Sequence, residues 1–219
     1  MRINKYVALA TGMSRRAADA AIVAERILAN GILPMAGQQI SVSDLVTLDG
    51  QRITPSVKTI TIMLNKPIGY VCSRDGQGSK TIYELVPENL HELKPVGRLD
   101  KDSSGLLLMT TDGQLAYKLT HPKFEKIKKY KIALNKDLSE GDFEKITKTG
   151  IALDDGVSKF DLESVNNQVK EWKIEMKEGR NRQIRRTFES LGYNVVKLHR
   201  THFGEYTLGT MKAGSYTQA

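Results

Sequence analysis

The sequence predicts an α+β protein, in which a small domain of two helices and a hairpin precedes a larger domain with a mixed, mostly antiparallel sheet. Two observations carry this prediction. Apolar residues at helical spacing end in glycine near the start of the chain, and helical and strand-like segments then alternate irregularly. The irregular order, without a repeat of fixed period, argues against a regular βαβ arrangement.

The two predicted helices of the small domain come first. The segment "INKYVALA", from Ile3 to Ala10, places apolar residues on one helical face, and Gly12 is a natural stop. Ser14 is a suitable cap for a second helix, "SRRAADAAIVAE". Arg15 and Arg16 then fall in the first turn of that helix, where the dipole opposes cations and a bound phosphate would favour them. A solvated helix start is the plain alternative.

The rest of the small domain is predicted as a hairpin and a linker. Asn30-Gly31 favours a tight turn, and "DLVTLDG" is an alternating strand that ends at Asp49-Gly50. The segment "GQRITPSVK", residues 50–58, has no periodicity and contains glycine, proline and serine. We therefore expect a domain with its linker over residues 1–58 and a second domain over residues 59–219.

The larger domain opens with the strand "TITIMLN", and its hydrophobic run "GLLLMTT" is typical of a buried strand. Further strands are predicted at "KKYKIAL", "SKFDLESV", "EWKIEMK" and "NVVKLHR". Helices are predicted at "TIYELV", "DGQLAYKLTH", "SEGDFEKITKTG" and "NRQIRRTFESLG". This order favours an α+β domain with a large mixed or antiparallel sheet.

Composition restricts the compartment and the chemistry. Of the 219 residues 40% are hydrophobic, enough for a core, and Cys72 is the only cysteine, which fits a reducing compartment. His199 and His202 lie close in sequence, but no third ligand accompanies them, so no metal is expected. No apolar run approaches the roughly 20 residues of a membrane span. We expect a soluble cytoplasmic protein.

Basic charge is concentrated in patches, within a formal net charge of +8. Residues 121–136 contain six lysines and one glutamate, and residues 176–200 contain seven lysines and arginines and two glutamates. Tyr130 and Phe188 lie within these patches. Such patches favour a groove for phosphates with rings for stacking, although two unrelated solvated faces would look alike.

The segment "EGRNRQIRR", residues 178–186, gathers donors at a helix start. Arginine binds phosphate or carboxylate through two parallel donors, and Asn181 and Gln183 could read a base edge. Placed at the helix start, Asn181 and Arg185 would lie one turn apart on one face. The simpler explanation is an exposed basic helix.

Asp100 is an acidic residue in the basic setting "VGRLDKDSSGLLLMTTDG", residues 96–113. If it is buried, its charge needs a partner, and Arg185 is a candidate from elsewhere in the chain. An ionised, partly dry carboxylate with one free oxygen can act as a nucleophile or a base. On the residues alone, a structural salt bridge is the favoured explanation.

These motifs together resemble a known family. "NKPIGYV", the Asp100 motif, "KYKI", "EGRNRQIRRTFESLGYNVVKLHR" and "RTHFGEYTLGTMKAG" occur in the order of the RsuA/RluB-type ribosomal RNA pseudouridine synthases. The N-terminal block resembles the small RNA-binding domain named after ribosomal small-subunit protein four, most clearly at "INKYVALATGMSRRAADA". The resemblance covers most of the chain.

The resemblance implies a site and a reaction. Asp100 would be the catalytic aspartate, as nucleophile or as base, Arg185 would pair with it, and Tyr130 would stack on the flipped base above Ile184 or Leu198. Cofactors and metals would be absent, and the partner would be RNA, with no DNA and no membrane contact, bound by a monomer. The expected RNA-binding residues are Lys5, Arg15, Arg16, Arg98, Arg180, Asn181, Arg182, Gln183 and Arg186.

Two other functions compete with this one. A non-catalytic RNA-binding or ribosome-assembly factor would use the same basic groove without isomerising a base. A nucleotide-dependent RNA enzyme is disfavoured, because "GQGSKT" at residues 76–81 lacks the glycines of a phosphate-binding loop.

Overall fold

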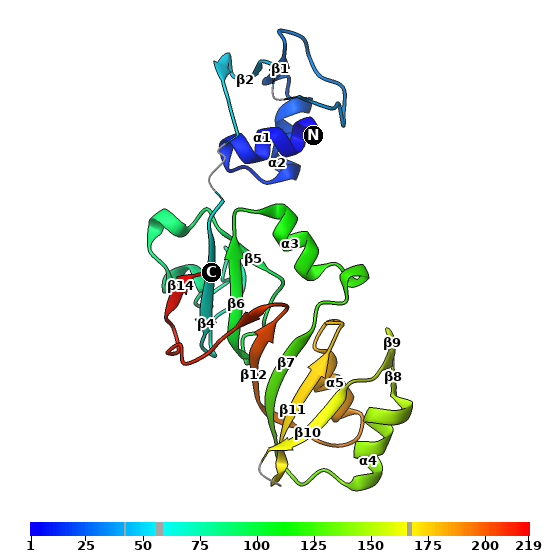
Figure 1. Ribbon diagram of the computed structural model, residues 1–219. Helices are drawn as coiled ribbons and strands as arrows, with labels where there is room; N and C mark the ends of the chain where they lie inside the picture. Colours follow the sequence, from blue (N-terminus) through cyan, green and yellow to red (C-terminus); the bar gives the residue numbers. More distant parts are fainter. Residues whose placement is uncertain (42, 56–58, 166–167) are drawn as a thin grey trace. The chain divides into compact units, whose positions relative to one another are not determined.

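A computed structural model describes residues 1–41, 43–55, 59–165 and 168–219, and the chain divides into two compact units, Met1–Thr59 and Ile60–Ala219 (Figure 1). The stretch 50–58 was expected to be a linker throughout. Gln51–Arg52 instead form strand β3, while residues 56–58 lie outside the described residues.

The first unit has the two predicted helices. α1 spans Ile3–Thr11 and ends at Gly12, whose φ of 76° is left-handed, as a glycine allows at this position. α2 spans Arg15–Val23, and the Ser14 side chain accepts a hydrogen bond from the Ala17 amide. The apolar faces of both helices meet in one core, which includes Ile3, Val7, Ala18 and Ala21.

A three-stranded sheet completes this unit, in the order β1 (Ile27–Ala29), β2 (Val46–Leu48) and β3. Both predicted turns are present. Asn30 and Gly31 have φ values of 53° and 80°, and Asp49 and Gly50 have φ values of 52° and 79° where β2 turns into β3.

The second unit is built on one nine-stranded sheet, described in the order β10-β11-β7-β12-β6-β4-β14, with β5 and β13 paired at its sides. β12 and β6 are parallel and the other pairs are antiparallel, which confirms the predicted mixed, mostly antiparallel sheet. The strands are β4 (Thr61–Lys66), β5 (Lys94–Val96), β6 (Ser104–Thr110), β7 (Lys128–Leu134), β10 (Asp161–Val165), β11 (Gln168–Met176), β12 (Val195–Phe203), β13 (Tyr206–Thr207) and β14 (Tyr216–Gln218).

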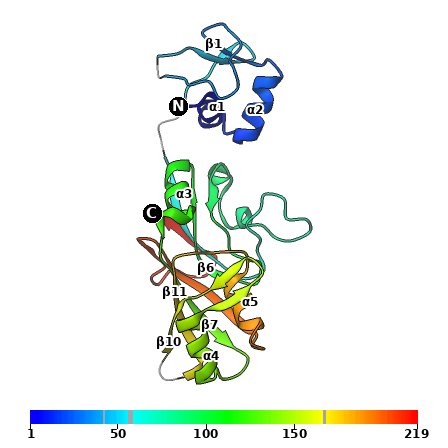
Figure 2. The ribbon, with the colours of Figure 1, turned by 90° about the vertical axis from the view of Figure 1, so that its right-hand side faces the viewer.

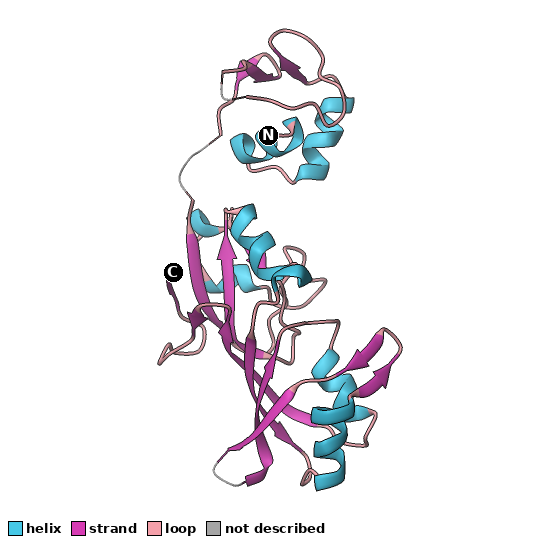
Figure 3. Cartoon of the chain, turned by 45° about the vertical axis from the view of Figure 1, so that its right-hand side comes forward, coloured by secondary structure: helices cyan, strands magenta, loops and turns pink. Residues whose placement is uncertain are grey.

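The helices of this unit are short and lie beside the sheet (Figure 3). "TIYELV" forms a 3-10 helix over Ile82–Leu85, and two more span Glu88–Leu90 and Pro122–Phe124. The α-helices are α3 (Gly113–Thr120), α4 (Glu140–Glu144), which continues as a π-helix over Lys145–Thr149, and α5 (Gln183–Glu189). None of the helices in the described residues has the length and apolarity needed to cross a bilayer.

Strand β6 explains the hydrophobic run that was predicted to be buried. Leu106 and Leu108 pack into one cluster with Leu119 of α3, whereas Leu107 and Met109 belong to the main core. Successive strand residues point to opposite faces, so both faces of β6 are covered and its leucines and methionine are buried on one face or the other.

α5 covers the main core next to β7, β11 and β12 (Figures 1 and 2). Phe188 of α5 is fully buried in the same cluster as Ile132 of β7 and Trp172 of β11. α5 is thereby fixed against the centre of the sheet, and the residues that precede it are held near the strands.

Asp142 of α4 is bonded to the segment between α5 and β12. Its carboxylate accepts hydrogen bonds from Ser139 Oγ, Lys145 Nζ and Tyr193 Oη, each at 2.8 Å. The bonds from Lys145, Ser139 and Tyr193 lower the pKa of Asp142 from 3.8 to about 2.

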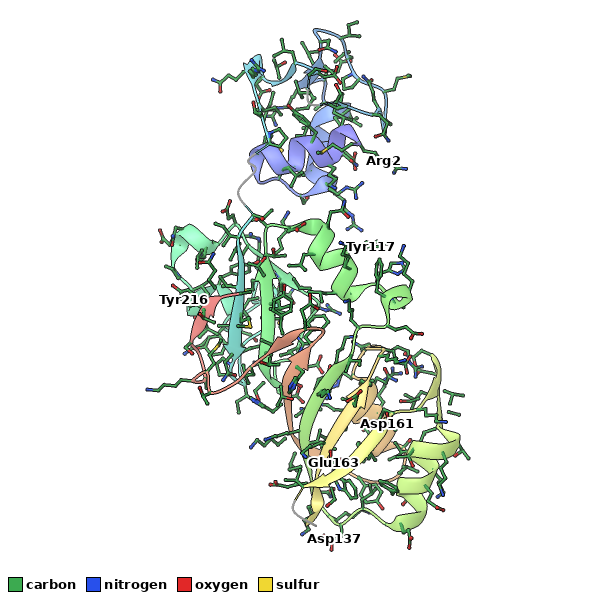
Figure 4. The ribbon with its side chains drawn as sticks, in the orientation of Figure 1. Arg2, Tyr117, Asp137, Asp161, Glu163 and Tyr216 are labelled. Atoms are coloured by element: carbon green, nitrogen blue, oxygen red, sulfur yellow. The ribbon has the colours of Figure 1, made fainter. Side chains whose placement is uncertain are left out.

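We predict that Asp142→Asn lowers the free energy of unfolding by about 1–2 kcal/mol at neutral pH. A depressed carboxylate pKa gives stability that is present above 3.8 and lost as the pH falls through about 2, so the difference from the unmodified protein should vanish at that acidic end. Urea unfolding across pH measures it. Asp137→Asn, at an exposed residue (Figure 4), is the control; a gap independent of pH would contradict the prediction.

Candidate active site

The loop that carries Asp100 joins β5 to β6 and is held from beneath by a buried lysine. Lys66, at the end of β4, is fully buried. Its Nζ donates hydrogen bonds to the carbonyls of Pro67 at 3.0 Å, Asp100 at 3.0 Å and Ser103 at 2.7 Å. Burial lowers the pKa of Lys66, and nearby acidic groups, among them Asp100, oppose that shift. The backbone on both sides of Asp102 is therefore fixed by one ammonium group.

Two arginines from the segment around the start of α5 meet two carboxylates of this loop. Arg182 Nη1 lies 3.4 Å from Asp100 Oδ2 and 3.3 Å from Asp102 Oδ1. Arg185 Nε lies 3.3 Å from Asp102 Oδ2, and Arg185 Nη2 donates to the Asp102 carbonyl at 2.9 Å.

The prediction that Arg185 pairs with Asp100 is wrong. Among the described residues, Arg182 is the arginine that contacts the Asp100 carboxylate, and Arg185 pairs with Asp102. The reason is geometric: Arg185 Nη1 donates to the Val195 carbonyl at 2.6 Å, which holds its guanidinium away from Asp100.

The charges around Asp102 decide its ionisation. Burial alone would raise the pKa of Asp102, but the hydrogen bond from Arg182 and the charges of Arg185 and Arg182 outweigh burial and lower it. Burial lowers the pKa of the Arg185 guanidinium. Asp100 keeps a 35% exposed side chain, and its Oδ1 has no hydrogen-bond partner within the described part of the chain. One carboxylate is thus engaged by both arginines, and the other keeps a free oxygen.

A cavity of about 530 Å³ brings the predicted residues together. Tyr130 of β7, Leu198 of β12 and Ile184 of α5 are all buried and line it with Asp100 and Arg185. The volume lies within the roughly 300–1,000 Å³ typical of small-molecule sites. The lining also includes the exposed residues Arg98, Asn181 and Arg182.

Three residues expected to bind RNA form hydrogen bonds or ion pairs with other residues of the chain. Arg180 Nη1 contacts Asp155 at 2.7 Å, and its Nη2 donates to the Val157 carbonyl at 2.9 Å. Arg186 pairs with Asp154 and with Asp155. These acids lie on the hairpin of β8 (Ile151–Leu153) and β9 (Gly156–Ser158), which the sequence analysis did not predict.

Gln183 is the third of these residues. It is 2% exposed, and its side chain bonds to Ser158 Oγ and to Glu178. α5 begins at Gln183, so Asn181 lies outside the helix and does not share a helical face with Arg185, contrary to expectation. Arg182 precedes the helix in a left-handed conformation, with φ 43°, which turns its side chain independently of the helix.

The remaining predicted RNA-binding residues lie in the first unit. Arg15 and Arg16 occupy the first turn of α2 and are exposed, as predicted, and Lys5 is half-buried on α1. Their contribution to binding stays a prediction.

Three residues of the site could not be recognised as site residues from the sequence. Lys66 was not singled out, and Lys128 and Arg200 were counted only within basic patches, yet Lys128 and Arg200 line the cavity and Lys66 holds its loop. The signal for Lys66 is its place at the end of an apolar strand, just before Pro67. In the described residues, no group of three His, Cys, Asp or Glu side chains could hold a metal ion.

Comparison with known proteins places the chain in a family. Residues 60–190 match the family model described as RNA pseudouridylate synthase, and this match covers more than half of the chain. The protein therefore belongs to the RNA pseudouridylate synthase family.

Individual relatives agree with this assignment. The chain is 33% identical to ribosomal large subunit pseudouridine synthase B of Bacillus subtilis, over 97% of this chain and 89% of the relative. It is 32% identical to ribosomal small subunit pseudouridine synthase A of Salmonella typhimurium, over 95% of this chain and 91% of the relative. A crystal structure of a pseudouridylate synthase superposes with a TM-score of 0.72 at 30% identity, covering 100% of this chain and 96% of the other.

We predict that Lys66→Met reduces kcat on the order of 100-fold with little change in KM, because a loop displaced by about 1 Å misplaces the Asp100 carboxylate in the cavity. Steady-state kinetics measure this effect. Lys101→Met is the matched control, since Lys101 is in the same loop and its Nζ, among the residues that the structure describes, donates only to Ser79 Oγ at the surface. Equal kinetics for both variants would show that the buried ammonium does not position the loop.

We predict that Arg180→Ala lowers the free energy of unfolding by about 1–3 kcal/mol, because it removes the bonds that hold the β8–β9 hairpin. Arg98→Ala, at an exposed residue with no hydrogen bond or ion pair in the described structure, should leave stability unchanged and weaken RNA binding. Urea unfolding and RNA titration of both variants test this. An Arg180 variant of normal stability and poor RNA binding would restore its predicted role in binding RNA.

Proposed function

We propose that this protein isomerises specific uridines in ribosomal RNA to pseudouridine, with Asp100 as the reacting carboxylate. The observation that carries the proposal is the shared cavity, in which Asp100 lies with the Tyr130 ring and the apolar side chains of Ile184 and Leu198. The names of the relatives, which refer to both the large and the small ribosomal subunit, support ribosomal RNA as the substrate class.

The reaction rearranges bonds within one nucleotide. The bond from uracil N1 to the ribose C1′ breaks, the base turns, and a bond from C5 to C1′ forms, while the proton on C5 is lost and N1 gains one. Because reactant and product have the same composition, the reaction consumes no co-reactant, which supports an enzyme without a cofactor or metal.

Asp100 acts either by attacking C1′ or by removing the proton from the adjacent ribose carbon. Both routes need an ionised carboxylate with a free oxygen close to the sugar. Arg182 Nη1 contacts Oδ2 at 3.4 Å, and the free Oδ1 supplies the reacting atom. Arg185 acts through Asp102, which it holds together with Arg182.

The base must leave the RNA stack before any of this happens, at a cost of about a few kcal/mol. Tyr130 offers an aromatic ring to receive it and, in this proposal, assists the loss of the C5 proton. Ile184 and Leu198 supply apolar contacts for the ring of the base. Burial of all three residues keeps these surfaces fixed before RNA binds.

The RNA chain around the target needs further contacts. Arg98, Asn181 and Arg182 are exposed at the cavity, and the first unit supplies further cations at Lys5, Arg15 and Arg16. The exposed rings of Tyr117 (Figure 4) and Phe124 pack edge to face, next to His121 at the cavity. They offer stacking surfaces for unpaired bases. The protein acts as a cytoplasmic monomer on RNA, with neither DNA nor a membrane as its partner.

We predict that Asp100→Asn abolishes pseudouridine formation while RNA affinity falls less than about tenfold. The amide is nearly isosteric with the carboxylate but can neither attack the sugar nor accept its proton. Carbodiimide labelling of treated ribosomal RNA, mapped by primer extension, measures the product, and filter binding measures affinity.

Asp137→Asn, at an exposed residue, serves as the control. Full activity of the Asp100 variant would remove this residue from the mechanism. An unmodified protein that binds RNA but never forms pseudouridine would favour the non-catalytic RNA-binding function.

A further inference from the structure

Two cationic side chains lie together beneath the cavity. Arg200 of β12 is 3% exposed, and Lys128 of β7 is half-buried. Both contact the same ring: the Arg200 Cζ is 4.7 Å and the Lys128 Nζ 5.4 Å from the centroid of Phe203. Both also line the cavity that contains Asp100. Two positive charges therefore share one partly dry pocket.

The Arg200 guanidinium is incompletely satisfied. Its Nε donates to the Leu106 carbonyl at 2.8 Å, whereas its buried Nη2 has no hydrogen-bond partner in the described structure. The strand that carries Arg200 cannot shift to bring Nη2 to a hydrogen-bond partner. A Cβ at Gly105 would lie 2.2 Å from the Arg200 carbonyl oxygen, so the two backbones are already in close contact.

The Lys128 ammonium group is also incompletely satisfied. In the part of the chain that the structure describes, its Nζ reaches only the Lys126 and Lys177 carbonyls, at 3.3 and 3.4 Å. Burial and the neighbouring charge of Arg200 lower the pKa of Lys128. The carboxylate that acts against this shift is Glu178, but that group bonds to Arg180 and Gln183. Within the described residues, no ion pair links a carboxylate to Lys128 or Arg200.

Such an arrangement is unfavourable without an anion. Buried charges need a partner of opposite sign, and two like charges in a shared pocket repel each other with an energy that a low dielectric increases. An unpartnered guanidinium nitrogen beside an ammonium offers charge-assisted donors to a phosphate. The chain thus has a place for an anion that it does not fill itself.

The position of Arg200 and Lys128 in the sheet indicates which anion they would bind. Arg200 lies directly opposite Tyr130 in the β12–β7 register. Directly opposed strand residues are about 4.5–5.5 Å apart. An anion at Arg200 therefore lies about one nucleotide's reach from a base stacked on Tyr130.

We propose that Arg200 and Lys128 form an anion subsite that binds a backbone phosphate flanking the extruded uridine. The identification of the anion as an RNA phosphate rests on the proposed function; the presence of the subsite does not. A phosphate held here fixes the sugar between the cations and the Asp100 loop, because both line the same cavity.

The test compares two lysine variants with equal net charge. Lys128→Met removes a subsite cation, and Lys148→Met removes a lysine with a 68% exposed side chain on the π-helix after α4. Binding of a short fluorescein-labelled oligouridylate is titrated over a range of salt concentrations. We expect the slope of log affinity against log salt to fall by about 0.7 for Lys128→Met, because one phosphate contact is lost, and to stay unchanged for Lys148→Met.

A second arm uses sulfate as a small anion, with the thermal midpoint in sulfate compared with that in chloride at equal ionic strength. Sulfate should raise the midpoint more for the unmodified protein and Lys148→Met than for Lys128→Met. Arg200→Lys should keep most of this gain and Arg200→Met should lose it, so folding of the buried variant is checked by the same melt.

Equal salt slopes for the two lysine variants, together with equal sulfate gains, would overturn the subsite. These measurements decide the inference whether or not the protein forms pseudouridine. Failure of the subsite and failure of the proposed function are therefore distinguishable.

Discussion

The site depends on one buried ammonium group. Lys66 is fully enclosed, and removing its charge from water costs several kcal/mol unless polar atoms surround it. Three backbone carbonyls do so, and those of Asp100 and Ser103 belong to the loop between β5 and β6. The loop cannot shift without leaving the charge unsatisfied. The backbone that carries Asp100 is thus held by the solvation of a lysine on another strand, while Arg182 contacts the carboxylate itself.

The arginine-rich segment before and within α5 divides its charges between two tasks. Arg182 and Arg185 reach the carboxylates of the Asp100 loop, whereas Arg180 and Arg186 hold the acidic turn of the β8–β9 hairpin. A segment that reads as a continuous basic surface therefore presents less free charge to RNA than its composition suggests. The same division makes the segment rigid, because its arginines anchor it to two separate parts of the unit. A rigid segment keeps the cavity wall fixed beside the Asp100 carboxylate.

Sequence reasoning was most accurate where one local signal decides the outcome. The Ser14 cap, the Gly12 stop and the doubly covered β6 followed from residue type and spacing alone. It failed where the outcome depends on distant partners. The strands β8 and β9 are too short to show a period, so the acids that occupy Arg180 and Arg186 were not foreseen. The left-handed residue Arg182 shifted the helix start and exchanged the arginine partners of Asp100 and Asp102. From sequence, Lys66 would be expected at the surface, because no local pattern predicts that three backbone carbonyls will accept hydrogen bonds from its ammonium group.

The cavity balances its charges unevenly, in a way that suits a nucleotide. The carboxylates of Asp100 and Asp102 are balanced by Arg182 and Arg185. Arg200 and Lys128, in contrast, lack a counterion within the described residues. A nucleotide carries one negative group, its phosphate, and a neutral sugar and base. Bound with the phosphate at the cations, it presents the sugar, and not a second negative charge, to the carboxylate. Were the carboxylates unbalanced, they would instead repel the phosphate; were the cations paired internally, nothing would orient the backbone. The uneven charge compensation therefore supports the proposed subsite, because a nucleotide held by its phosphate at Arg200 and Lys128 would present its sugar to Asp100.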